Sequence, residues 1–178
     1  MTRLLPLGLA ALASSLLLQA CAEDARTTAS PGPAQSTSLA ECADVLPDHA
    51  FTTLGWEPSG EPALDSGTCT RTAAQGDVAV QRWPVAAVGG DDLPRAAQRA
   101  FEDRCKDLYA QAATRVDWLG SDMPGCVALG GRRGQSTILA LTTHHTLVEA
   151  RVSADQPTSP DQVRAGLVEL ARAAATAF

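Results

Sequence analysis

The sequence predicts an α+β domain in which an antiparallel sheet carries helices on one face and two disulfides hold the parts together. Strand-like segments come in groups between helix-like segments, which is typical of α+β rather than of alternating βαβ units. Capping sequences and prolines mark the helix starts. Four of the five cysteines fall within the expected folded part of this 178-residue chain.

The N-terminal segment has the parts of an export signal. Arg3 is its only charge, Leu4 to Leu18 form an apolar core of about 15 residues, and a small residue, Ala20, precedes Cys21. A spanning helix needs about 20 apolar residues, so this core is short for one. We therefore predict a signal peptide over residues 1–20. A signal peptide cut elsewhere and an uncleaved anchor helix remain as alternatives.

The sequence Leu-Gln-Ala-Cys that ends at Cys21 resembles the lipobox of bacterial lipoproteins. The resemblance implies that Cys21 is the first mature residue and carries a diacylglyceryl group, often with a palmitate-type chain on its amine. Two or three such chains would make anchoring effectively permanent. Residues 22–37 carry no large apolar side chain, so residues 21–37 are predicted to be a lipidated, disordered tether. The expected location is then the outer face of the cytoplasmic membrane, and this membrane is the first expected partner.

The composition limits the remaining partners. Without residues 1–20, 13 basic residues stand against 20 acidic ones, a net charge of −7. Such a domain gains nothing from a polyanion, so nucleic acid is not expected. Residues 38–178 have the size of one domain, and no sequence pattern calls for a cofactor.

Four cysteines remain when Cys21 is lipidated: Cys42, Cys69, Cys105 and Cys126. An even number in an exported domain indicates two disulfides, for which three pairings exist. The spacings of 27, 36 and 21 residues contain no CxxC pair and disfavour zinc.

An internal sequence repeat would select one of the three disulfide pairings. Cys42-Ala-Asp resembles Cys105-Lys-Asp, and a tryptophan follows each of these cysteines, by 14 and 13 residues. Two copies of one helix–strand–strand unit would pair Cys42 with Cys69 and Cys105 with Cys126. A linked Cys69–Cys105 peptide under non-reducing conditions would contradict this.

The first half of the domain is expected to begin with a helix. Ser38-Leu-Ala-Glu41 is a capping box, and Pro47 either ends this helix or starts a second helical turn before Gly55. Residues 68–73 and 77–83 alternate as a hairpin does, but either face of the second strand could point to the core.

The second half repeats this order with longer elements. Asp92 and Pro94 start a helix whose inward stripe includes Phe101 and Cys105. Strands are expected at about 126–130, 135–142 and 146–152. A second capping box, Ser159-Pro-Asp-Gln162, starts the last helix.

Candidates for chemistry are weak. Adjacent strand residues point to opposite faces, so His144 and His145 cannot share a metal there, and they suit a solvated turn. His49 suits a surface position. Ser136 lacks the second glycine of a nucleophile elbow. No metal site is predicted.

Candidates for binding are of two kinds. Trp56, Trp83 and Trp118 are expected to anchor the core, or to line a groove of the kind in which ligands bind. Arg132 and Arg133 belong to a glycine-rich hairpin turn that is either a solvated turn or an anion- or partner-binding tip.

At Cys42-Ala-Asp-Val-Leu-Pro47, and again at Gly67-Thr-Cys69, the chain resembles small actinobacterial lipoproteins of unknown function. The resemblance covers the anchor and the first half and transfers no catalytic residues. We expect a non-enzymatic, lipid-anchored binding or accessory module for an unknown envelope protein or small ligand. The alternatives are a carrier of a lipid or cell-wall precursor, which needs an apolar cavity, and an envelope hydrolase that joins Ser136 to His144 or His145.

Overall fold

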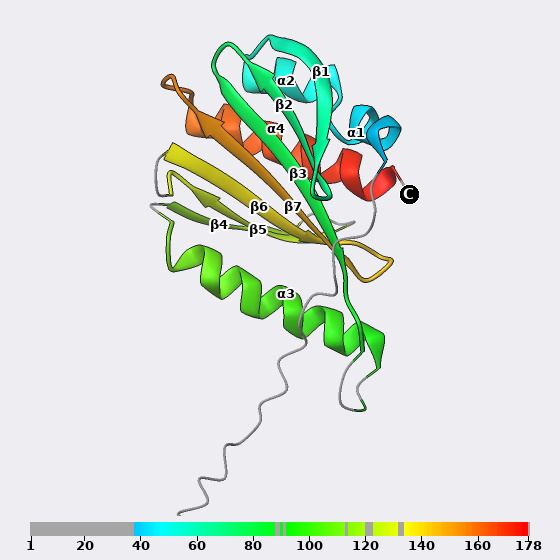
Figure 1. Cartoon of the computed structure of the whole chain (residues 1–178). Coiled ribbons are helices and arrows are strands. Elements are labelled where there is room, and N and C mark those ends of the chain that lie inside the picture. Colours follow the sequence, from blue (N-terminus) through cyan, green and yellow to red (C-terminus); the bar gives the residue numbers. More distant parts are fainter. Residues whose placement is uncertain are drawn as a thin grey trace, which may run out of the picture.

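The computed structural model describes residues 38–87, 90, 92–112, 114–119, 123–131 and 134–177, without the side chains of 115–119. These residues form one seven-stranded antiparallel sheet of order β1-β2-β3-β7-β6-β5-β4 and four helices (Figure 1). The predicted signal peptide, Cys21 and the tether lie outside the described residues. The elements in chain order are α1 (Leu39–Val45), α2 (Asp48–Leu54), β1 (Pro58–Asp65), β2 (Thr68–Ala73), β3 (Gly76–Pro84), α3 (Leu93–Tyr109), β4 (Thr114–Leu119), β5 (Pro124–Leu129), β6 (Gln135–Leu141), β7 (Thr146–Ala154) and α4 (Pro160–Thr176).

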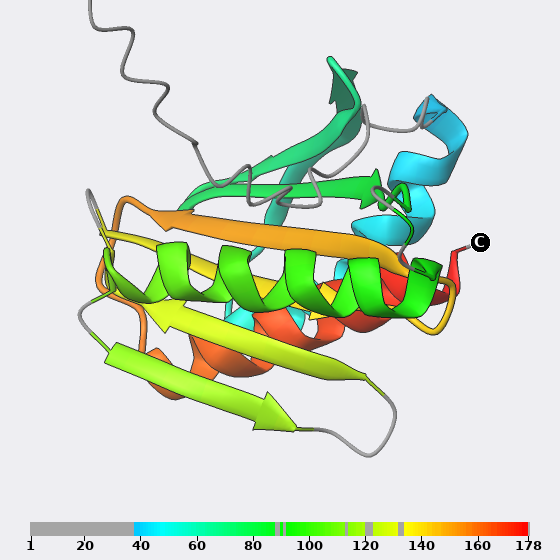
Figure 2. The same ribbon diagram turned by 90° about the horizontal axis from the view of Figure 1, so that it is seen from below.

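The α+β class, the antiparallel sheet and both disulfides are confirmed, but the helices do not share one face. Helices α1, α2 and α4 cover one face, and α3 lies on the other, in front of the sheet in Figure 2. Strand β7 shows why, because Leu147 packs in the cluster under α3 while Val148 packs in the cluster under α4. Successive strand residues point to opposite faces, so a strand that is apolar on both needs cover on both.

Local signals set the helix starts. Ser38 and Glu41 form the predicted capping box of α1, in which the Ser38 backbone N–H donates to the Glu41 carboxylate. That hydrogen bond holds the pKa of Glu41 below its usual value. Gly55 ends α2 in a left-handed conformation, with φ of 75°. The second predicted capping box is wrong in part: Ser159 is the N-cap of α4, but its side chain makes no capping hydrogen bond.

The two disulfides join Cys42 to Cys69 and Cys105 to Cys126, as the repeat predicted. Each ties a helix, α1 or α3, to the middle strand of a three-stranded meander. The meanders β1-β2-β3 and β4-β5-β6 flank β7, and β3 and β6 both run antiparallel to it. A twofold axis along β7 would therefore relate the two units and would place their helices on opposite faces, as observed.

The strand register supports this relation. Cys69 pairs with Val80, which pairs with Ala150, whereas Cys126 pairs with Leu139, which pairs with Glu149. The two disulfides thus reach the sheet at one level of β7, from opposite faces. The tryptophans do not follow the repeat, because Trp56 precedes β1 while Trp118 lies within β4.

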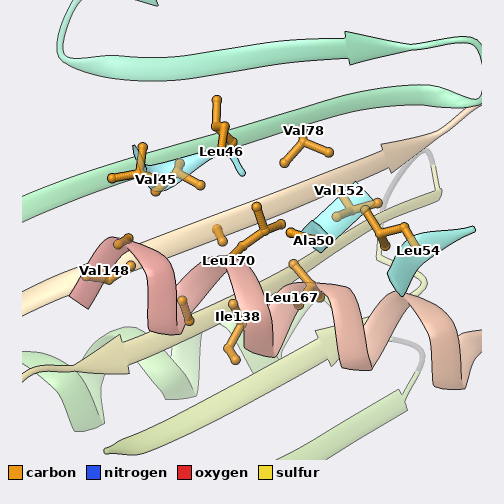
Figure 3. Packing of buried hydrophobic residues seen from close by; sticks show 14 of the residues in the cluster. Val45, Leu46, Ala50, Leu54, Val78, Ile138, Val148, Val152, Leu167 and Leu170 are labelled. Carbon is orange, nitrogen blue, oxygen red and sulfur yellow. The ribbon is translucent and has the colours of Figure 1, made fainter. Parts of the chain in front are cut away.

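The larger core cluster lies between the sheet and α1, α2 and α4. Figure 3 shows Leu167 and Leu170 of α4 among strand residues such as Ile138, and Leu54 of α2 beside them. Leu54 is 1% exposed and lies against the backbone of α4 at Gly166. A glycine is needed there because a Cβ would overlap Cγ and Cδ2 of Leu54.

We expect Gly166→Ala to destabilise the protein by about 1–2 kcal/mol, because overpacking outweighs the gain in helix propensity. The neighbouring Ala165 is exposed, so Ala165→Gly is the matched control and should also destabilise, by about 1 kcal/mol. Urea unfolding measures both. Gly166→Ala should cost less in a Leu54→Ala background, and a stabilising Gly166→Ala would contradict the close packing.

Candidate functional site

A polar groove runs along the C-terminal half of α3, where this helix leaves part of the sheet face uncovered. The groove has a volume of about 450 Å³. It is lined by Arg104, Asp107, Leu108, Ala110, Gln111, Gln135, Thr137, Glu149 and Arg151, and is called the α3 groove below. Its residues come from the end of α3 and the two residues that follow it, and from β6 and β7.

A charged triad forms one side of the α3 groove. The carboxylate of Glu149 is the centre: its Oε2 accepts a hydrogen bond from Nη2 of Arg104 at 3.2 Å, and its Oε1 lies 3.5 Å from Nε of Arg151. The Glu149 side chain is only 9% exposed, whereas those of Arg104 and Arg151 are 41% and 33% exposed. The carboxylate is thus held inside, and the two guanidinium groups reach the surface.

Two further contacts position these arginines. The guanidinium of Arg104 lies over the Trp83 ring, 5.0 Å from its centroid, a cation–π geometry. Among the described residues, Nε of Arg151 is buried and has no hydrogen-bond partner. Its ion pair with Glu149 supplies charge compensation without a well-formed hydrogen bond.

The sequence builds this arrangement from simple local rules. Glu149 and Arg151 are two residues apart on β7 and therefore point to the same face of the sheet. Arg104 precedes Cys105, whose disulfide to Cys126 of β5 fixes α3 on that face. The triad is therefore positioned by a disulfide and by strand alternation.

On the opposite face of the sheet, the hydrogen bonds of Arg71 give it a structural role. Its Nη1 donates to Oδ1 of Asp48 at 2.6 Å and to the carbonyl of Leu46 at 3.1 Å, and its Nε donates to the carbonyl of Gly60. The guanidinium also lies over the Phe51 ring. Arg71 thus ties the α1–α2 junction to the edge of the sheet.

Arg82 of β3 is buried on the same side of the sheet as Val80, at 7% exposure. Burial lowers the pKa of Arg82 to about 10, and the charge of Glu41 acts in the opposite direction. Arg82 therefore stays protonated at neutral pH.

Of the predicted binding residues, the two that the structure describes, Trp56 and Trp83, lie on opposite faces of the sheet. Trp56 is 3% exposed in the larger core, and its Nε1 donates to Oγ1 of Thr158 at 3.2 Å. Trp83 packs against the smaller cluster on the other face, beside the α3 groove. Arg132, Arg133 and the side chain of Trp118 lie outside the described residues.

The hydrolase hypothesis required the Ser136 hydroxyl to lie within hydrogen-bond reach of His144 or His145. The structure contradicts this requirement. Ser136 is the second residue of β6, next to the β5–β6 turn, and its hydroxyl accepts a hydrogen bond from the backbone N–H of Gly130. His144 and His145 lie in the turn beyond the other end of β6. About six residues of strand separate them from Ser136, roughly 20 Å at about 3.3 Å per residue.

The other histidine, His49, is a surface residue, with a side chain that is 64% exposed and 3.8 Å from a carboxylate oxygen of Glu169. In the described part of the chain, no group of three or more histidine, cysteine or acidic residues could hold a metal ion.

Sequence reasoning missed Arg104, Glu149 and Arg151. One signal was present: in the strand Thr-Leu-Val-Glu-Ala-Arg-Val, one face carries valine and alanine, while the other carries two opposite charges next to a leucine. Such a pair within an otherwise apolar strand indicates a polar contact on a partly covered face.

The comparisons with known proteins leave the family open. No protein-family model matches the chain, and no curated protein matches it in sequence. Among solved structures, a GTP-binding regulator from Thermotoga maritima is similar at 12% identity, over 80% of this chain and 90% of that one, with a TM-score of 0.37. A similarity of this size carries no conclusion about function.

The fold and the site define a disulfide-bonded α+β domain with a charged surface groove. Its two disulfides fit a protein that works outside the cytoplasm. None of the described helices is long and apolar enough to cross a membrane.

Proposed function

We propose that the protein is a lipid-anchored, non-enzymatic binding or accessory module at the outer face of the cytoplasmic membrane. The lipobox-like sequence before Cys21 supports the anchor, and the disulfides support the compartment. The observation that carries the binding role is the α3 groove, in which two arginines are positioned around one buried carboxylate.

The chemistry of the α3 groove favours binding over proton transfer. Guanidinium groups stay protonated and offer only donors, so Arg104 and Arg151 suit the recognition of an anion rather than acid–base steps. The buried carboxylate of this groove, Glu149, already faces both of them. The groove therefore presents a fixed pattern of donors.

The carrier alternative has weaker support, because the mainly apolar pockets among the described residues are hollows open to the surface rather than enclosed cavities. A lipid or precursor needs an apolar cavity, and the apolar side chains of the described residues pack into two clusters, one on each face of the sheet. The α3 groove is polar and opens to the surface.

We expect Cys21→Ala to move the full-length protein from the membrane fraction to the aqueous fraction, because lipidation needs the thiol of that residue. Cell fractionation and metabolic labelling with palmitate measure the change. The matched control is Ser36→Ala in the predicted tether, which should leave both results unchanged. A Cys21→Ala protein that stays in the membrane would support the uncleaved anchor helix instead.

A further inference from the structure

We propose that the α3 groove binds a small zwitterion, that is, an amino acid or the end of a short peptide, through its carboxylate. This rests on the proposed binding role and specifies its ligand class. Arg104 and Arg151 are the anchoring residues, because a guanidinium offers a planar set of donors that matches a carboxylate.

The two guanidinium groups are held in place before any ligand arrives. Glu149 faces both of them from inside, and the Trp83 ring supports Arg104. Positioned donors lose less conformational entropy when a ligand binds. Both side chains line the groove and are about one-third to two-fifths exposed, so a ligand in the groove can reach them.

The charge pattern selects a zwitterion over a phosphate. The groove carries two arginines and two carboxylates, Asp107 and Glu149. Arg104 and Asp107 are three residues apart on α3 and share one face of the helix. A phosphate dianion would meet repulsion from both carboxylates, whereas a ligand carboxylate can pair with the arginines while its ammonium group approaches the exposed Asp107.

The remaining polar lining fits peptide groups. Gln111 and Gln135 offer amide donors and acceptors, and Thr137 offers a hydroxyl. Leu108 and Ala110 add an apolar margin for a small side chain. The volume of about 450 Å³ is within the range of pockets that hold small molecules.

An amide NMR titration of the purified, oxidised mature protein tests this with glycylglycine, acetate and inorganic phosphate. Glycylglycine should shift the signals of Gln135, Thr137 and Arg151. It should bind at least about tenfold more tightly than either anion, a difference of about 1.4 kcal/mol.

Variants locate the site. Arg151→Gln and Arg104→Gln should each weaken glycylglycine binding about tenfold or more, because each variant loses a charged hydrogen bond to the ligand carboxylate. Asp107→Asn should weaken glycylglycine binding but leave acetate binding unchanged. Arg164→Gln, on the exposed side of α4, is the matched control and should change nothing.

Several results would overturn the proposal: stronger binding of phosphate, shifts outside the groove, no shift up to the solubility limit of glycylglycine, or an Asp107→Asn protein that binds as the wild type does. Thermal melts identify any variant that fails to fold. If Arg104→Gln fails to fold, Arg104→Lys replaces it as the test variant, because it keeps the charge but loses the planar donor set. These results are independent of the Cys21 fractionation. If the groove bound none of the three ligands, the proposed lipid anchor at Cys21 would be unaffected. Conversely, a Cys21→Ala protein released from the membrane can still bind the zwitterion.

Discussion

Removing either disulfide should destabilise the domain by about 3–4 kcal/mol, because the bonds close loops of 27 and 21 residues in the unfolded chain. A domain of this size has a total stability of about 5–15 kcal/mol. Losing one bond should therefore leave a folded but weakened protein, and losing both should leave it largely unfolded. The paired substitutions are Cys42→Ala with Cys69→Ala, and Cys105→Ala with Cys126→Ala.

The two losses should differ in character. Helix α1 has seven residues, too few to persist alone, and its Cys42 side chain is fully buried, so α1 should detach while the rest of the sheet remains. Helix α3 has 17 residues and packs through alanines and Phe101 on β5, β6 and β7. If α3 detaches when the Cys105–Cys126 bond is lost, the apolar cluster between α3 and the sheet should become exposed and bind more of a hydrophobic dye.

Thermal and urea unfolding of both double variants, beside the wild type with and without reductant, measure these effects. Each thermal midpoint should fall by roughly 6–16 °C, at about 2–4 °C per kcal/mol. Amide exchange should show lost protection in α1 for the first pair and in α3 for the second. Midpoints within a degree of the wild type would show that packing alone holds the helices.

The disulfide pairing could be predicted because it is a local property. Each bond lies within one unit of chain, and similar sequence around Cys42 and Cys105 marked the two units. Helix starts were likewise predictable, since Ser38 and Pro160 act on the turn that follows them. The side of the sheet that each helix covers is not local, and here the prediction for α3 was wrong.

The two outer strands were missed for a physical reason. Strand β1 contains Pro58 and Pro62, which remove backbone donors and argue against a central strand, but an edge strand tolerates them. The sequence likewise predicts no strand for the residues of β4, at the other edge. Edge strands pair on one side only, so their sequences are less constrained and their signals are weaker.

The α3 groove could not be predicted because its triad joins residues far apart in the chain. Arg104 and Glu149 are separated by 45 residues, and their contact depends on the register of β7 and on the face that α3 covers. The candidates from sequence were large aromatics and a local arginine pair. Of those that the structure describes, only Trp83 touches the triad, where its ring supports Arg104.

Glu149→Ala should destabilise the domain by about 2–4 kcal/mol, because it leaves two partly buried guanidinium groups without their counterion. The estimate is below the value for a fully buried pair, since both arginine side chains are at least one-third exposed. Urea unfolding measures the change. The matched control is Glu102→Ala on the exposed side of α3, which should cost less than about 0.5 kcal/mol.

The triple variant Arg104→Met, Glu149→Leu, Arg151→Met separates stability from binding. Apolar residues of similar volume often replace a buried ionic network at no cost, so the triple variant should regain most of the stability that Glu149→Ala loses. It should nevertheless bind no glycylglycine. If it were as unstable as Glu149→Ala, the triad would be a structural feature of the α3 interface. A stable triple variant would instead mean that the sheet does not need these charges for folding, and that what they contribute is the positioned pair of guanidinium groups in the α3 groove.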